Sequence, residues 1–98
     1  MMLLDENDVA AGLLLAVNLK GEGYHNPENV GWADGQPICL GATAMACLGA
    51  EANYFPSGPR GLGVTFSHEA AGIFRIAVSE ADAGQTWGDA VTHALNES

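Results

Sequence analysis

One segment, residues 37–51, is apolar around nearly the whole circumference of the helix that its composition predicts. Pro37 is a favourable first-turn residue, and only Thr43 and Glu51 interrupt the apolar character. A helix that is apolar on every side is a buried one, so we expect this segment to be the central helix of the fold. Its small residues would let neighbouring helices approach closely: Gly41, Ala42, Ala46, Gly49 and Ala50. Because each glycine costs about 1 kcal/mol of helix stability relative to alanine, tertiary packing must hold this helix.

Another helix is predicted over residues 7–20, with Gly21 as its stop signal. Asp5 and Asp8 have capping-box spacing, although Asn7 could equally be the N-cap. One broad arc of the helix collects Val9, Ala10, Leu13, Leu14, Ala16 and Val17. Leu15 and Leu19 fall on a different side. Two apolar stripes predict contacts on both sides of the helix, either within the core or against another chain.

Two amphipathic helices are predicted in the C-terminal third of the chain. Ser67 is a good N-cap for the first, and Thr86 with Asp89 makes a capping-box-like start for the second. The apolar face of the first helix comprises Ala70, Ile73, Phe74, Ala77, Val78 and Ala81. That of the second comprises Trp87, Ala90, Val91, Ala94 and Leu95. The expected fold is therefore all-α: residues 1–98 form a single, compact four-helix domain with a buried central helix 2.

Two long loops rich in glycine and proline, over residues 21–37 and 53–66, separate these helices. Loops of this length in a small domain are unusual and are often functional or mobile. Trp32 is expected to pin the first loop to the core, because it brings a large apolar area. Residues 64–66 at the end of the second loop could be extended.

The charge of the chain excludes several partners. Its 98 residues carry 12 acidic and three basic side chains, a net charge of −9. Binding to a nucleic-acid backbone or to an anionic membrane surface needs clustered lysines and arginines, which are absent here. Scattered acidic charge usually serves solubility, and the sharper alternative is an acidic mimic of nucleic acid that occupies a DNA-binding protein.

The apolar stretch over residues 9–17 is preceded by acidic rather than basic residues and is too short to span a bilayer. We therefore expect a cytoplasmic protein. Cys39 and Cys47 would lie about 12 Å apart along a helix, whereas a disulfide needs Cα atoms within about 7 Å. An internal bridge is not expected, and both cysteines are interpreted as small buried apolar residues.

A thiol enzyme centred on Cys39 is one alternative interpretation. A thiol near a helix N-terminus can have a lowered pKa, and Gln36 could assist an oxyanion. His68 would then serve as the base and Asp82 or Asp89 as its orienting partner. The usual cysteine-hydrolase arrangement places the base on a sheet, and none is evident in the sequence, so a structural role for Cys39 is favoured.

Two other motifs fall short of the chemistry they suggest. His68 and Glu69 begin like a zincin motif, but Gly72 stands where the second histidine would be needed. Residues 58–63 are glycine-rich but lack the lysine and hydroxyl residue of a phosphate-binding loop. Arg60, at the tip of this segment, is a candidate contact residue. We expect no metal and no cofactor.

Several short motifs resemble a family of small, uncharacterised helical proteins of actinobacteria and their phages. The similarity comprises residues 13–17, the pair Gly31 and Trp32, residues 37–42 and residues 82–91. Residues 79–82 depart from the family, whose members carry a stretch resembling Trp-Asn-Asp at this point. The resemblance implies a helical fold and an actinobacterial or phage setting, and it implies no catalytic residues.

The sequence as a whole favours a small, non-enzymatic binding protein that docks on a protein partner. If the protein is phage-encoded, that partner would be a protein of the bacterial host. The candidate contact residues are Leu15, Leu19 and Arg60. A homo-oligomer formed through Leu15 and Leu19 is the simpler version of this hypothesis, and the nucleic-acid mimic and the thiol enzyme are the alternatives.

Overall fold

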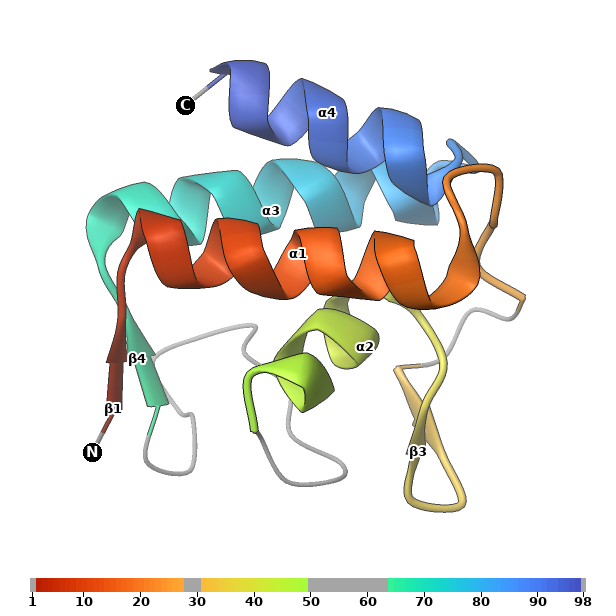
Figure 1. Ribbon diagram of the computed structural model, residues 1–98, viewed down its shortest axis with the longest axis horizontal. Coiled ribbons are helices and arrows are strands. Elements are labelled where there is room, and N and C mark those ends of the chain that lie inside the picture. Colours follow the sequence, from red (N-terminus) through yellow and green to blue (C-terminus); the bar gives the residue numbers. More distant parts are fainter. Residues whose placement is uncertain (1, 28–30, 50–63, 98) are drawn as a thin grey trace.

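The computed structural model describes residues 2–27, 31–49 and 64–97 (Figure 1). The helices are α1 (Glu6–Lys20), α2 (Leu40–Cys47), α3 (His68–Asp82) and α4 (Trp87–Glu97). The strands are β1 (Met2–Leu4), β2 (Trp32–Ala33), β3 (Gln36–Pro37) and β4 (Val64–Phe66). The all-α expectation accounts for the helices but not for these strands, which form two short ladders.

Helices α3 and α4 begin where their capping patterns predict, and α1 begins one residue before the predicted range, because Asp5 rather than the alternative Asn7 is its N-cap. Asp5 caps α1 in a capping box, because its Oδ1 accepts the amide of Asp8 at 2.9 Å and the Asp8 carboxylate accepts the amide of Asp5 at 3.1 Å. Ser67 caps α3 by accepting the amide of Ala70 at 3.1 Å. The hydroxyl of Thr86 accepts the amide of Asp89 at 3.1 Å and satisfies a free donor at the start of α4.

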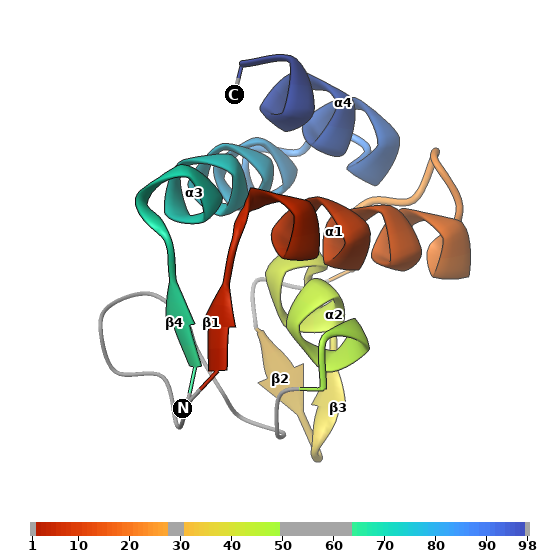
Figure 2. The same cartoon turned by 60° about the vertical axis from the view of Figure 1, so that its left-hand side comes forward.

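The starts of α1 and α3 are held together by a parallel ladder. Met2 pairs with Val64 and Leu4 with Phe66, so residues 64–66 are extended as the sequence suggested. The amide of Ser67 then donates to the carbonyl of Leu4 at 2.9 Å. As a result α1 and α3 leave the ladder side by side and run in the same direction, while α4 returns antiparallel to both (Figures 1 and 2).

The loop predicted over residues 21–37 contains a β-hairpin. Its strands pair Trp32 with Pro37 and Ala33 with Gln36. Asp34 and Gly35 form the turn with positive φ angles of 51° and 76°, the combination that a two-residue type I′ turn requires. Trp32 packs against the core as expected, although it remains partly exposed.

Helix α2 is shorter and less completely buried than the sequence predicts. Pro37 belongs to β3, Cys39 is the N-cap, and the chain turns out of the helix at Gly49, where φ is 90°. Residues 40–45 are buried. Cys39 is only half-buried and Cys47 is exposed, so the prediction that both cysteines are buried is wrong for Cys47 and is met only in part by Cys39. Helices α1 and α3 each pack against all the other helices, while α2 packs mainly against these two.

The hydrophobic core lies where the helices meet. Two glycines bring α2 close to its neighbours. A Cβ atom on Gly12 of α1 would lie 2.7 Å from Cγ of Leu48, and one on Gly41 of α2 would lie 3.0 Å from a methyl carbon of Val78. Among the described residues, the largest fully buried apolar side chains are Trp87, Leu13, Leu40, Met45, Val9 and Val91.

Candidate binding surface on the first helix

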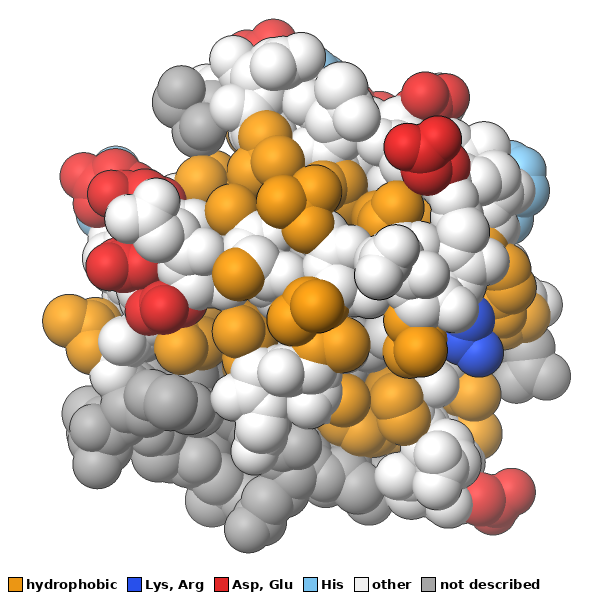
Figure 3. All heavy atoms as spheres, in the orientation of Figure 1, with side chains coloured by type: hydrophobic (Ala, Val, Ile, Leu, Met, Phe, Trp, Pro, Cys, Tyr) orange, Lys and Arg blue, Asp and Glu red, His pale blue; other side chains and the backbone are white. Residues whose placement is uncertain are grey.

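Helix α1 presents apolar side chains on the outside as well as toward the core. Its inner side buries Val9, Leu13, Ala16 and Val17. On its outer side Leu14, Leu15 and Leu19 are 52%, 51% and 67% exposed. We call these three leucines the leucine surface. Figure 3 shows apolar side chains gathered across this face of the molecule.

The sequence predicted the exposure of the leucine surface only in part. The separate stripe of Leu15 and Leu19 left two possibilities open, contacts within the core or against another chain, and both side chains lie outside the core. Leu14 shares the broad apolar arc of Val9 and Leu13 in the sequence but is half exposed, because the buried side of α1 does not reach the edge of that arc where Leu14 lies. Arg60, the third candidate contact residue, lies outside the described residues.

Acidic side chains stand at both ends of α1. Asp5, Glu6 and Asp8 are exposed around its first turn. Glu22 follows its last turn, and the Glu22 carbonyl accepts the amide of Gly88 at 2.9 Å, which brings the first turn of α4 with Asp89 to the same end. In Figure 3 acidic side chains lie at the margins of the apolar area rather than within it.

The thiol hypothesis finds little geometric support. The Cys39 sulfur accepts the amide of Ala42 at 3.5 Å as the N-cap of α2. Asp82 accepts a hydrogen bond from Asn26, and His68 is an exposed residue at the start of α3. Within the described ranges, no hydrogen bond joins Cys39 to either of them. Desolvation raises the pKa of the Cys47 thiol, which opposes formation of a thiolate there.

A histidine cluster that the sequence analysis missed links α3 to α4. The Nδ1 atom of His93 hydrogen-bonds the Glu80 carboxylate, and its Nε2 atom lies 3.3 Å from Glu97. The hydrogen bond with Glu80 is the main cause of a raised His93 pKa, and the charges of both carboxylates add to it. The i,i+4 spacing of His93 and Glu97 was the available signal. Among the residues described, no group of three or more metal-ligating side chains is arranged to hold a metal ion.

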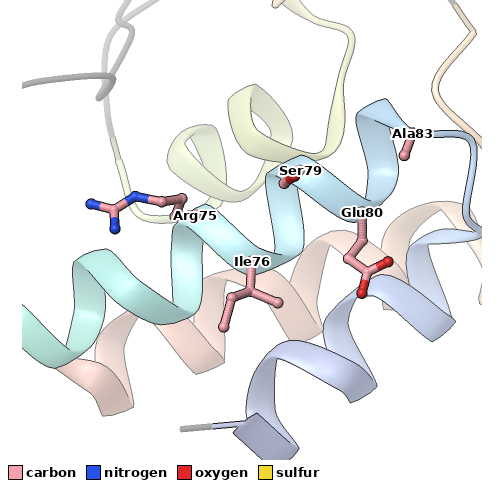
Figure 4. Close-up of a pocket in the computed structure, with 5 residues that line it drawn as sticks. All are labelled: Arg75, Ile76, Ser79, Glu80 and Ala83. Atoms are coloured by element: carbon pink, nitrogen blue, oxygen red, sulfur yellow. The ribbon is translucent and has the colours of Figure 1, made fainter.

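An open hollow of about 330 Å³ lies along the outer side of α3, lined by Arg75, Ile76, Ser79, Glu80 and Ala83. Figure 4 shows Glu80 pointing toward α4 and Arg75 extending in another direction. Since Glu80 is engaged by His93, the hollow brings no pair of free catalytic groups together. It is a weaker candidate site than the leucine surface.

Comparisons of the chain with protein-family models, with curated proteins and with solved structures return no match. No helix in the described part of the chain is long and apolar enough to cross a membrane.

Proposed function

We propose that the protein is a non-enzymatic binding module that docks on another protein through the leucine surface. The observation that carries the proposal is the exposure of Leu14, Leu15 and Leu19 on one helix whose opposite side already packs in the core. Large apolar side chains that cluster on a surface mark interaction sites more often than scattered ones do. In keeping with the resemblance to actinobacterial and phage proteins, the proposed partner is a cytoplasmic protein of a bacterial host.

The energy available from this surface suits a reversible interaction. Fully burying one leucine contributes about 1.5–3 kcal/mol, so covering the exposed halves of three leucines contributes about 3 kcal/mol. Contacts around the leucines must supply the rest of a specific affinity, because association itself costs several kcal/mol. The leucine surface is therefore proposed as the centre of a larger contact.

The test replaces Leu15 and Leu19 together with glutamate. A matched control, Ser79→Glu with Ala83→Glu, adds the same two charges four residues apart on exposed positions at the end of α3, where Ser79 lies in the last turn and Ala83 is the C-cap. Each variant is used as bait in a bacterial lysate, and its mass in solution is measured by light scattering. We expect one protein to be enriched near stoichiometry by the wild type and the control, and to be lost with the leucine variant.

Two results would contradict the proposal. In one, the leucine variant retains every protein that the wild type captures. In the other, the wild type self-associates, and the leucine variant abolishes this without losing any heterologous partner. The second result would assign the leucine surface to a homo-oligomer.

The acidic surface favours a second candidate, the mimic of nucleic acid. Described acidic side chains from α1, the β2–β3 hairpin, α3 and α4 are exposed, including Asp5, Asp34, Glu69 and Asp89. Binding that depends on such charges weakens steeply with added salt, whereas binding through the leucines persists. Repeating the capture at low and high salt distinguishes the two functions.

A further inference from the structure

We infer that the occupant of the leucine surface is an amphipathic helix of a different protein, with an apolar stripe along its length and lysine or arginine at both ends. This inference rests on the proposed function and specifies the chemistry of the partner. It is carried by the shape of the exposed side of α1 and by the charges at its ends.

The exposed side of α1 has the form that a helical partner requires. Its exposed residues Ala11, Leu14, Leu15, Asn18 and Leu19 occupy one continuous arc of about 140°. The 15 residues of α1 extend about 22 Å at a rise of about 1.5 Å per residue. Helices pack on one another through such rows of side chains three and four positions apart, and an amphipathic helix of three to four turns matches this length.

The charges at the two ends of α1 select a basic partner. Asp5, Glu6 and Asp8 stand at one end, and Glu22 with Asp89 stands at the other. Lys20 is the one cation in the described part of this region, and its ammonium lies over the Tyr24 ring, 5.6 Å from the centroid. A helix lying along α1 would therefore have acidic groups near both of its ends. Complementary lysines or arginines there would steer the encounter and fix the partner's position.

The acidic groups at the ends of α1 disfavour a second copy of this chain or an anionic membrane as the occupant of the leucine surface. In a two-fold symmetric pair of this chain, each end of α1 would meet an acidic end of its neighbour, whichever way the helices ran. Each copy also carries a net charge of −9, so self-association would bring like charges together. An anionic membrane surface is repelled for the same reason.

The experiment measures binding of the intact protein to three synthetic peptides at about 150 mM salt, where exposed charges are partly screened. The first peptide is a helix with a leucine stripe and lysines at both ends. The second has the same stripe with glutamates at the ends, and the third has the composition of the first with its stripe scrambled. We expect the lysine-ended striped helix to bind at least about tenfold more tightly than either of the others, because the second peptide replaces charge attraction with repulsion at both ends and the third cannot cover the leucines along one stripe.

Leucine variants separate apolar docking from simple charge attraction. Leu15→Glu with Leu19→Glu makes the protein more negative, so charge attraction alone predicts tighter binding of the lysine-ended peptide. Docking on the leucine surface predicts that binding is lost. Leu15→Gln with Leu19→Gln leaves the charge unchanged and should lose binding as well, while Ser79→Glu with Ala83→Glu should retain it. Circular dichroism checks that each variant is folded.

Equal binding of the lysine-ended and glutamate-ended helices would overturn this inference and leave the proposed function standing. Equal binding of the striped and scrambled peptides, unchanged in the leucine variants, would overturn both, because charge alone would then explain the binding. A dimer that the leucine variants dissociate would make a second copy of the chain the occupant.

Discussion

The side-chain oxygen of Asn26 accepts the indole N–H of Trp87 at 2.8 Å, although 61 positions separate the two residues. The same oxygen accepts the amide of Leu40 at 3.1 Å, and the Asn26 amide nitrogen donates to Asp82 at 3.0 Å. One side chain thus joins the first turn of α2, the end of α3 and the start of α4. Tyr24 adds an edge contact on Trp87, with ring centroids 4.7 Å apart.

Asn26→Ala should lower the free energy of unfolding by about 2–3 kcal/mol, because it leaves the indole N–H of a fully buried tryptophan without its acceptor. Urea unfolding measures the change. Asn18→Ala serves as the control, since Asn18 is exposed on α1 and its replacement should stay within about 0.5 kcal/mol of the wild type. A similar loss in both variants would contradict the role assigned to Asn26.

A double-mutant cycle with Trp87→Phe isolates the hydrogen bond between the two residues. Trp87→Phe removes the hydrogen-bond donor. In that background, Asn26→Ala should therefore lower the free energy of unfolding by about 1 kcal/mol less than it does in the wild type. The quantity measured is the coupling free energy from four unfolding curves. Additive losses would mean that Asn26 stabilises the fold through Leu40 and Asp82 instead.

Features of the fold that depend on local sequence could be predicted. The caps at Asp5, Ser67 and Thr86 are determined by side chains three residues from the amides they bind, and spacing reveals them. The hairpin has an equally local signal in Asp34-Gly35, a preferred type I′ turn, although the glycine-rich composition of residues 21–37 predicts only a loop.

Long-range features could not be predicted in the same way. The parallel pairing of β1 with β4 joins two strands of three residues that lie far apart in the sequence. Such short apolar runs do not reveal which strand pairs with which. The contacts of Asn26 depend on where the folded chain places Trp87 and Asp82. For the candidate surface, periodicity places Leu15 and Leu19 on a separate side of the helix, but the exposure of all three leucines follows from which side of α1 the helices α2, α3 and α4 cover.

Gly12→Ala and Gly41→Ala should each destabilise the protein by about 1–3 kcal/mol, although alanine is the better helix former. At Gly12 the new methyl group would lie 2.7 and 2.8 Å from two carbons of Leu48 and 3.1 Å from the Ala44 carbonyl oxygen. At Gly41 it would lie 3.0 Å from Val78 and 3.3 Å from Phe74. Urea unfolding measures both losses.

Gly72 of α3 provides the matched control for these glycines. Nothing lies within 4 Å of a Cβ atom built there, so Gly72→Ala should raise the free energy of unfolding by about 0.5–1 kcal/mol through helix propensity alone. If Gly12→Ala and Gly41→Ala raised the free energy of unfolding as Gly72→Ala should, the result would contradict the conclusion that α2 packs too closely against its neighbours to leave room for a methyl group.

Thr43→Val should raise the free energy of unfolding by about 1 kcal/mol. The Thr43 side chain is buried in α2, and among the described residues its hydroxyl has no hydrogen-bond partner. Valine has nearly the same shape and removes the cost of desolvating that hydroxyl. Urea unfolding measures the change, and a loss of stability would show that the Thr43 hydroxyl does make a hydrogen bond.

His93 should make the packing of α4 on α3 depend on pH. Its pKa is raised above the ordinary value of 6.5, chiefly by the hydrogen bond with Glu80 on α3. A folded-state pKa above the unfolded one means that the protonated form stabilises the fold. That contribution is fully present below about pH 6.5, the ordinary pKa of histidine, and it is lost as the pH rises through the raised pKa of His93.

The measurement is the thermal midpoint of the wild type and of His93→Gln at several values between about pH 5 and pH 9. The thermal midpoint of the wild type should exceed that of His93→Gln most at the acidic end of this range. The difference between the two midpoints should shrink as His93 loses its proton. His68→Gln removes an exposed histidine outside the cluster and should leave the pH dependence of the wild type in place. Glu80→Gln should reproduce most of the effect of His93→Gln, because Glu80 is the main cause of the raised pKa. A constant difference between wild type and His93→Gln across this range would show that the cluster does not couple protonation to stability.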